Sequence, residues 1–235
     1  MIELLSPQKI SKEKILINEL KSFGLDYLDL NSTLGWNYVL DHIWLYRNIR
    51  NYLQSQKLSN PVILDVGCGN SPFHNFVEDK LCVNIWGIDR PEGFCHQEEL
   101  INTDYFVEFL KLKDFEENSV DILYWLSAIE HNGIESIRDL YTKSLYFLKP
   151  GGLLLITFPI SRKTYWFKDS QQTNLSIEDA VRIFDDNDIE GNFDNIWQEF
   201  RDNNLSLIDK YKKRYKHFSK EDPEFIVGGL NQIKS

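Results

Sequence analysis

The sequence lacks the features that mark exported, membrane-spanning and disulfide-stabilised proteins. Its three cysteines, Cys68, Cys82 and Cys95, are odd in number and have no metal-ligand spacing, so they predict neither a disulfide framework nor a metal site. No stretch approaches the roughly 18 consecutive apolar residues that cross a membrane, and residues 1–14 contain no signal-peptide core. We therefore expect a cytoplasmic protein without a membrane partner and without a metal.

Basic side chains are also scarce. The chain has 26 Lys and Arg against 36 Asp and Glu, which gives a formal net charge of −10. A protein that holds nucleic acid by counterion release needs a basic face, so nucleic acid is excluded as a partner and a small molecule is favoured. No internal repeat or low-complexity linker divides the 235 residues, which are enough to bury one large core.

The chain is organised around a short apolar run that ends in a glycine turn. Residues 61–66 predict a buried strand, Gly67 and Gly69 break it, and Ser71 with the following proline is typical of a helix start. Glycine lets the backbone approach a ligand closely, so this turn predicts a nucleotide-like ligand. Asp65 lies inside the apolar run, where a carboxyl group is costly unless something binds it.

The same turn argues against two common nucleotide-binding motifs. A dinucleotide fingerprint would have its third glycine at position 72, where this chain has Pro72. No Gly-Lys-Ser or Gly-Lys-Thr follows the glycines, so the phosphate-loop motif is absent as well. A carboxylate before the turn instead favours a ligand that carries an ammonium group.

Apolar runs alternate with helical stripes along the chain, a pattern typical of an α/β domain with a largely parallel sheet. A weaker helical stripe around Leu16 and Leu20 ends at Gly24. The expected helices cover residues 36–56, 72–80, 135–148 and 176–186, with a turn at 149–152. The expected strands cover residues 61–66, 81–89, 101–106, 120–126, 153–158, 205–211 and 224–233, the last of them broken by Gly228-Gly229.

Four short blocks follow one another along the chain: Leu64-Asp65-Val66-Gly67-Cys68-Gly69, Gly87-Ile88-Asp89, Ser119-Val120-Asp121-Ile122-Leu123 with Glu130-His131, and Leu148-Lys149-Pro150-Gly151-Gly152. In this order they resemble the signatures of class I S-adenosylmethionine-dependent methyltransferases, of the small-molecule kind typified by types 11 and 12. The resemblance covers residues 61–159. It implies a doubly wound, seven-stranded sheet with an antiparallel last strand, a cofactor site along the strand ends, and methyl transfer to O, N, C or S of an acceptor. Ser71 departs from the pattern, because many members have glycine there.

The resemblance implies roles for individual residues. Asp65 would lie near the amino group of the cofactor's methionine part, Asp89 would accept both ribose hydroxyls, and Asp104 would accept the adenine amino group. Alternatively, Asp65 caps the glycine turn and Asp89 is an ordinary acid at a strand end. We expect Asp121 to fix the start of its strand. The other expected cofactor-binding residues are Gly67, Cys68, Gly69, Arg90, Ser127 and Ala128.

A hydroxyl acceptor would need a general base, and His131 is the candidate. It alone of the five histidines lies in a strand-end loop of the expected site, and an imidazole titrates near neutral pH. A structural role for the Glu130-His131 pair is the alternative. We expect the remaining histidines to be surface or packing residues: His42, His74, His96 and His217.

The acceptor is expected to meet the less patterned parts of the chain. These are residues 1–58, interpreted as N-terminal helices forming a lid or cap, and an insertion at about 160–200 within the core of residues 59–235. An apolar satellite cluster is the alternative interpretation of their aromatic side chains. The candidate acceptor-binding residues are Trp36, Tyr38, Arg162, Tyr165 and Trp166.

The leading functional hypothesis is O-methylation of a sugar or a secondary-metabolite hydroxyl. N-methylation of a small amine is the nearest alternative, and it would need no base. A methyltransferase-fold protein that only binds a partner is the alternative from another class.

Overall fold

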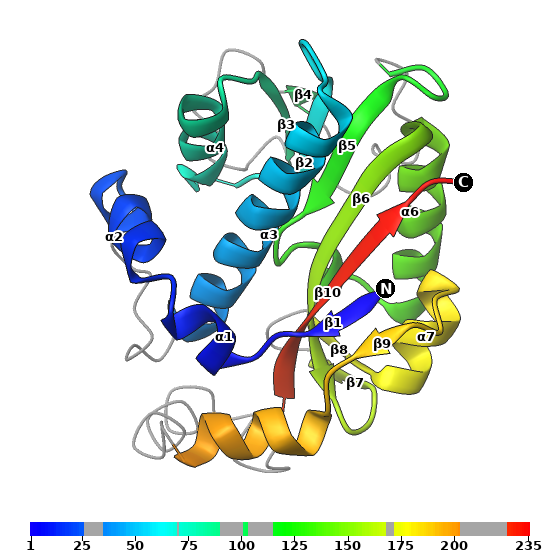
Figure 1. Cartoon of the computed structure of the whole chain (residues 1–235). Coiled ribbons are helices and arrows are strands. Elements are labelled where there is room, and N and C mark those ends of the chain that lie inside the picture. The colour runs from blue at the N-terminus through cyan, green and yellow to red at the C-terminus, as the bar shows by residue number, and fades with distance from the viewer. Residues whose placement is uncertain (26–34, 70, 90–100, 103–114, 168–171, 203–224) are drawn as a thin grey trace.

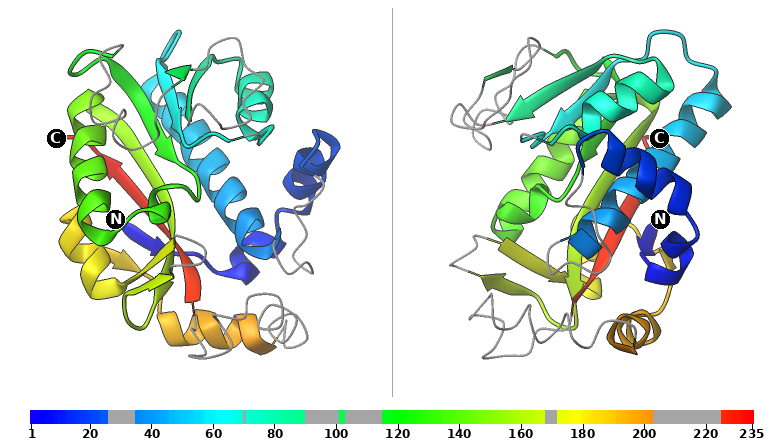
Figure 2. Two further views of the ribbon diagram at one scale, coloured as in Figure 1. Left: turned by 180° about the vertical axis from the view of Figure 1, so that it is seen from behind. Right: turned by 90° about the vertical axis from the view of Figure 1, so that its left-hand side faces the viewer.

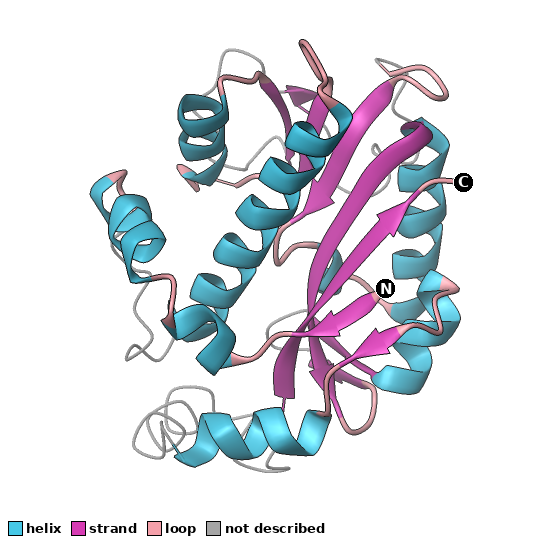
Figure 3. Ribbon diagram, viewed as in Figure 1, coloured by secondary structure: helices cyan, strands magenta, loops and turns pink. Residues whose placement is uncertain are grey.

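A computed structural model describes residues 1–25, 35–69, 71–89, 101–102, 115–167, 172–202 and 225–235. It is a twisted sheet with helices on both faces (Figure 1, Figure 3). The helices are α1 (Pro7–Ser11), α2 (Lys14–Ser22), α3 (Gly35–Gln56), α4 (Phe73–Leu81), the 3-10 helix η1 (Ile129–His131), α6 (Ile134–Phe147), α7 (Ile177–Phe184) and a helix over 193–202. The strands are β1 (Ile2–Leu4), β2 (Ile63–Val66), β3 (Ile85–Asp89), β4 (Ile101–Asn102), β5 (Val120–Trp125), β6 (Leu148–Ser161), β7 (Tyr165–Phe167), β8 (Gln172–Ser176), β9 (Ile189–Glu190) and β10 (Phe225–Ile233).

The main sheet has the expected doubly wound order. Its strands run β4-β3-β2-β5-β6-β10-β1, with β9 beyond β1. β2 pairs in parallel with β3 and β5, and β5 pairs in parallel with β6. β10 is antiparallel to β6, with Phe225 opposite Ser161 and Ile233 opposite Leu153. The mostly parallel sheet with an antiparallel last strand is therefore confirmed, and the short strands β7, β8 and β9 are additions to its seven-stranded path.

The central strands are apolar on both faces because helices cover both. All four residues of β2 and all six of β5 are buried, as expected for parallel strands between two helical layers. α3 packs on β6 and β10, whereas α6 packs on β6 beside α7. The edge-on view in Figure 2 shows α3 and α6 on opposite sides of the sheet. The carboxyl ends of β2, β3 and β5 thus open at one edge, where ligands bind in such folds.

Two adjacent glycines of β10 allow close packing, Gly229 against α3 and Gly228 against β6, and the strand runs through them. A strand broken at Gly228-Gly229 was expected, but β10 is continuous there. A Cβ on Gly229 would lie 2.6 Å from the ring of Trp44 on α3, and one on Gly228 would lie 2.8 Å from Ile160. The glycines therefore serve close packing and do not end the strand.

Three further expected elements are the turn at 149–152 and the strands at 101–106 and 205–211. The turn expected at 149–152 lies within β6, although Gly151 has a φ of +80° there. Of the strand expected at 101–106 the structure describes Ile101–Asn102, and the strand expected at 205–211 lies outside the described residues.

The N-terminal segment supplies a strand as well as helices. Ile2–Leu4 pairs antiparallel with β10, Ile2 lying opposite Leu230. The indole Nε1 of Trp44 donates to Glu3 Oε2 at 2.7 Å and joins this strand to α3. Residues 1–58 are thus joined to the core by backbone pairing. No helix in the described part of the chain is both long and apolar enough to cross a bilayer.

Replacing Gly229 by alanine is expected to destabilise the fold by about 1–3 kcal/mol, the usual cost of adding a methyl group to a packed core. The added Cβ meets the Trp44 ring at 2.6 Å, and α3 has to move away from β10 to admit it. Urea unfolding of Gly229→Ala and the wild type measures the difference.

Gly133→Ser is the control for this experiment. Gly133 is the N-cap of α6, and a Cβ there meets nothing within 4 Å. Serine is a favourable N-cap, so the control is expected to be neutral or stabilising. Equal stability of Gly229→Ala and the wild type would contradict the close packing of α3.

Candidate functional site

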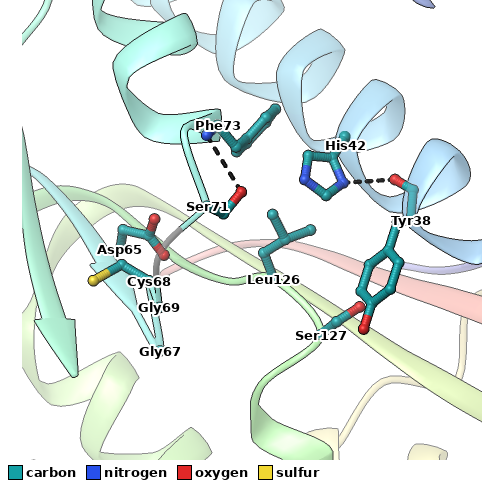
Figure 4. A pocket seen from close by; sticks show the side chains of 10 residues that line it. All are labelled: Tyr38, His42, Asp65, Gly67, Cys68, Gly69, Ser71, Phe73, Leu126 and Ser127. Atoms are coloured by element: carbon teal, nitrogen blue, oxygen red, sulfur yellow. Dashed lines mark hydrogen bonds between the residues drawn. The ribbon is translucent and has the colours of Figure 1, made fainter. Parts of the chain in front are cut away.

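A cavity of about 450 Å³ lies at the carboxyl ends of β2 and β5. The glycine turn after β2 forms one side, and α3 with the segment after β5 forms the other (Figure 4). Figure 4 shows Asp65 and Cys68 on the first side and Ser127 close to Tyr38 on the second. The cavity is lined by Tyr38, His42, Asp65, Gly67, Cys68, Gly69, Ser71, Phe73, Leu126 and Ser127.

The glycine turn is held against the end of β3 by its backbone. Gly67 N donates to Ile88 O at 2.7 Å, and Gly69 N donates to the Asp89 carboxylate. Gly67 and Gly69 have φ angles of +80° and +54°, which L side chains rarely adopt. The turn and Asp89 are therefore neighbours, as the strand order predicts.

Ser71 has a structural role that the sequence pattern did not reveal. Its Oγ accepts a hydrogen bond from Phe73 N at 3.3 Å, so it satisfies a backbone donor at the start of α4. Because Ser71 also lines the cavity, the residue that departs from the family pattern serves both the helix start and the cavity wall.

Asp65 is a buried acid, and the described residues place no charged cation beside it. The residue is only 3% exposed, and its Oδ1 has no hydrogen-bond partner among the described residues. Burial raises the pKa of Asp65 to about 8; the charge of Asp89 raises it further, and the Tyr124 hydroxyl opposes the shift. His74 Nδ1 lies 3.9 Å from Oδ2, but burial lowers the pKa of His74 to about 4 and leaves it neutral at pH 7. A cationic ligand group would stabilise the ionised form of Asp65.

α3 brings Tyr38 and His42 to the other side of the cavity. His42 Nδ1 lies 2.6 Å from Tyr38 O, and its ring meets that of Phe73 edge to face at 4.6 Å. Burial lowers the pKa of His42 to about 4, so the ring is neutral at pH 7. The packing role expected for His42 is present, and the residue lines the cavity as well.

Ser127 connects the cavity to a carboxyl group that sequence reasoning missed. Its backbone has a φ of +47°, and its N–H donates to Thr157 Oγ1 at 3.0 Å. The Ser127 hydroxyl donates to Asp41 Oδ2. Asp41, on α3, is 1% exposed, and burial raises its pKa well above the usual value for aspartate, more strongly than the bond from Ser127 lowers it.

The pair Glu130-His131 is divided between the interior and the surface. Glu130 is 6% exposed, its Oε2 has no partner among the described residues, and burial raises its pKa to about 8. His131 is exposed and does not line the cavity. The structure therefore gives the candidate base no place in the cavity. Ala128 is buried without lining it.

Of the expected acceptor-binding residues, Tyr38 lines the cavity. Arg162 pairs with Asp194 at 2.5 Å and lines a separate cavity of about 230 Å³. Tyr165 and Trp166 lie on β7, where Trp166 is exposed. Trp36 lies on α3 with its side chain outside the description, and two expected cofactor residues lie outside the described residues altogether: Arg90 and Asp104.

Asp121 holds the start of β5, as expected. Its Oδ2 accepts from Val62 N at 2.8 Å, and Lys149 Nζ lies 2.8 Å from both carboxylate oxygens. In the described part of the chain, no group of three or more His, Cys, Asp or Glu side chains has an arrangement that could hold a metal ion.

The buried carboxyl groups predict a stability that falls as pH rises from 6.5 to 8. Burial holds the pKa of Asp65 and of Glu130 at about 8 in the folded protein, whereas both ionise near pH 4 when unfolded. In this window the folded state binds more protons, so the free energy of unfolding falls by at most about 1.4 kcal/mol per pH unit and group. His42 and His74, whose pKa is lowered, affect the pH dependence of stability only below about pH 6.5. Urea unfolding across the window measures the slope.

Glu130→Gln tests the cause of this slope. Glutamine cannot ionise, so the variant is expected to lose part of the pH dependence. Asp139→Asn, on the exposed face of α6, is expected to keep the wild-type slope. A wild-type stability that is constant or rises between pH 6.5 and 8 would contradict the protonated state of these groups.

Comparison with known proteins gives matches over the same part of the chain. Residues 64–156 match the family described as methyltransferase domain. The chain is 30% identical over 188 residues to phosphoethanolamine N-methyltransferase 1 of Arabidopsis thaliana, covering 71% of this chain and 37% of that protein. It is 25% identical over 176 residues to phosphoethanolamine N-methyltransferase of Plasmodium falciparum, covering 69% of this chain and 65% of that protein. The chain thus spans less than two thirds of either relative.

A solved structure shares the fold. The crystal structure of geranyl diphosphate C-methyltransferase from Streptomyces coelicolor, in complex with Mg²⁺, geranyl diphosphate and S-adenosyl-L-homocysteine, matches with a TM-score of 0.52 and 12% identity. The match covers 82% of this chain and 80% of that one. Three observations agree with the sequence-based prediction of a methyltransferase. They are the strand order, the position of Asp89 beside the glycine turn, and the matched domain. Residues 64–156 thus form the methyltransferase domain of a class I S-adenosylmethionine-dependent methyltransferase.

Proposed function

We propose that the protein transfers the sulfonium methyl group of S-adenosylmethionine to the nitrogen of a small amine. The observation that carries the proposal is the acidic character of the cavity. Asp65 lines it, Asp41 lies behind Ser127, and no lysine or arginine of the described residues lines it. Such a cavity suits ligands with cationic nitrogen groups. The relatives named as phosphoethanolamine N-methyltransferases support the same class of acceptor.

The side of the cavity formed by the glycine turn is where we place the cofactor. Asp65 would pair with the ammonium group of the methionine part, which would satisfy its unpartnered Oδ1. Gly67 and Gly69 would let the backbone pass close to the ligand. Asp89, at the end of the neighbouring strand, would accept hydrogen bonds from the ribose hydroxyls. Cys68 and Ala128, with Arg90 and Asp104, remain predicted cofactor residues, whereas Ser127, which the sequence also assigned to the cofactor, would face the acceptor.

The protein's contribution to such a transfer is mainly alignment. S-adenosylmethionine supplies a methyl group already bound to a good leaving group. The nitrogen lone pair forms a bond to the methyl carbon while the carbon–sulfur bond breaks and its electron pair stays on sulfur. Tyr38 and Ser127 would hold the acceptor in line with that bond from the α3 side of the cavity, which is the proximity contribution that accelerates two-reactant steps.

Oxygen is the weaker candidate for the acceptor atom. A sugar or metabolite hydroxyl needs a base close to it, and His131 is exposed and outside the cavity. An amine brings its own lone pair once it is deprotonated. The shared fold does not decide between acceptor atoms, since the same fold occurs in a protein named as a C-methyltransferase.

Asp89→Ala is expected to weaken S-adenosylmethionine binding by about 10- to 100-fold, because hydrogen bonds to a charged group each contribute about 1.5–3 kcal/mol. Isothermal titration calorimetry measures the dissociation constants. Asp139→Ala, which removes an exposed acid from α6, is the matched control and is expected to bind like the wild type. No binding by the wild type at high micromolar ligand, or equal affinity in Asp89→Ala, would refute the cofactor site.

Acceptor choice is tested with a labelled methyl donor against ethanolamine, phosphoethanolamine and simple sugars. The proposal expects label in the amines. It also expects His131→Ala to keep the wild-type turnover, because the exposed ring lies outside the cavity. Label in the sugars alone, together with loss of turnover in His131→Ala, would favour O-methylation. Donor binding without transfer to any acceptor would favour a non-catalytic binding protein.

A further inference from the structure

The side of the cavity opposite the glycine turn contains a hydrogen-bonded pair that the cofactor does not account for. Ser127 lines the cavity, and its hydroxyl donates to Asp41 Oδ2. Asp41 itself is 1% exposed and does not line the cavity. The two residues are 86 positions apart in the sequence, on α3 and on the segment after β5. Ser127 is therefore the link between the cavity and a carboxyl group in the interior.

The bond between them has a direction. A hydroxyl has one donor hydrogen and two acceptor lone pairs, and Ser127 gives its hydrogen to Asp41. Its lone pairs are therefore what it offers to a group in the cavity, and they suit an N–H donor. An ammonium group that donates a hydrogen bond to Ser127 Oγ would begin a chain of hydrogen bonds that leads out of the cavity and ends on Asp41.

The surroundings of Asp41 contain nothing described that neutralises its charge. Oδ1 has no hydrogen-bond partner among the described residues, and none of their cations forms an ion pair with Asp41. The acid that acts on it from the neighbouring element is Glu130 of η1, whose charge also raises the pKa of Asp41. On its own helix the next residue is His42, which is neutral at pH 7. A carboxyl group in this position accepts a proton more readily than an exposed aspartate does.

An amine acceptor has to lose a proton to react. Alkylammonium groups ionise near the lysine value of about 10.4, so at pH 7 the nitrogen has no lone pair available for attack. The expected cofactor groups on the opposite side of the cavity do not provide a place for that proton. The pair of Ser127 and Asp41 does, because its hydrogen bonds already point away from the cavity.

We propose that Ser127 and Asp41 form a proton relay that deprotonates the acceptor's ammonium group before methyl transfer. The inference rests on the proposed function. In the step, the ammonium N–H bond breaks and its electron pair stays on nitrogen. The proton passes to Ser127 Oγ as the serine proton passes to Asp41 Oδ2, so the serine remains neutral and Asp41 becomes a carboxylic acid. Ser127 touches the substrate, and Asp41 is a positioning residue that acts through it.

The test measures methyl transfer to ethanolamine and to phosphoethanolamine by Asp41→Asn between pH 7 and pH 9.5. Asparagine keeps the size of the side chain and an oxygen that accepts from Ser127, but it cannot take the proton. We expect kcat to fall about 100-fold at pH 7, the lower range for loss of a proton acceptor. The deficit is expected to shrink as pH rises, since the amine then arrives already neutral. The affinity for S-adenosylmethionine is expected to stay within about twofold of the wild type.

Ser127→Ala provides an independent variant that leaves the buried carboxyl group in place. It breaks the same link, so it is expected to show the same pH-dependent loss of kcat. The double variant is expected to lose no more than either single variant, because both remove one chain of proton transfer. Asp139→Asn is the matched control on the exposed face of α6 and is expected to behave like the wild type. If Asp41→Asn fails to fold, Ser127→Ala carries the test.

Each outcome separates the relay from the proposed function. Wild-type transfer to an amine, with kcat unchanged in Asp41→Asn or in Ser127→Ala, overturns the relay alone. A loss of kcat that is equal at every pH shows a structural role and also overturns it. Wild-type transfer to sugar hydroxyls and to no amine overturns the proposed function, and the relay with it.

Discussion

The burial of carboxyl groups with no matching cation in the described part of the chain is the constraint on which the rest of the site depends. An ionised carboxylate out of water costs several kcal/mol even after the protein relaxes. Asp65 and Glu130 avoid this cost by binding protons, as the pKa of about 8 of each indicates. Asp65 is therefore mostly uncharged at neutral pH, although it lines the cavity. A cationic ligand changes that state, because its charge releases the protons and recovers the electrostatic attraction.

One helix produces much of this burial. Trp44 of α3 packs against Gly229, where a side chain on the strand would leave no room for the ring. Asp41 lies three residues earlier on the same helix and reaches Ser127. The close approach of α3 to β10 thus determines how deeply Asp41 is placed and which hydroxyl it meets. The packing of α3 on β10 and the chemistry proposed within the cavity are therefore linked through one helix.

The fold and one side of the site could be predicted from the sequence, because they follow from local patterns. A buried run followed by glycines places Asp65 at a turn, and parallel pairing places Asp89 beside it. Asp41 could not be predicted in this way. On α3 it has the appearance of a polar residue of an amphipathic helix, and only the pairing with Ser127 across 86 residues reveals its role. His131 shows the opposite case, because its loop was located correctly but the side chain that points inward is that of Glu130.

The pairing of β1 with β10 has a consequence for how the chain folds. Ile2 lies opposite Leu230, so this ladder cannot form until nearly the whole described chain has been synthesised. Until then one edge of β6 also lacks its partner, because β10 fills the place between β6 and β1. Contacts of such long sequence separation slow folding, and an unpaired edge invites association with other chains. The last strand to arrive therefore both completes the sheet and ends the period in which the nascent protein is vulnerable to aggregation.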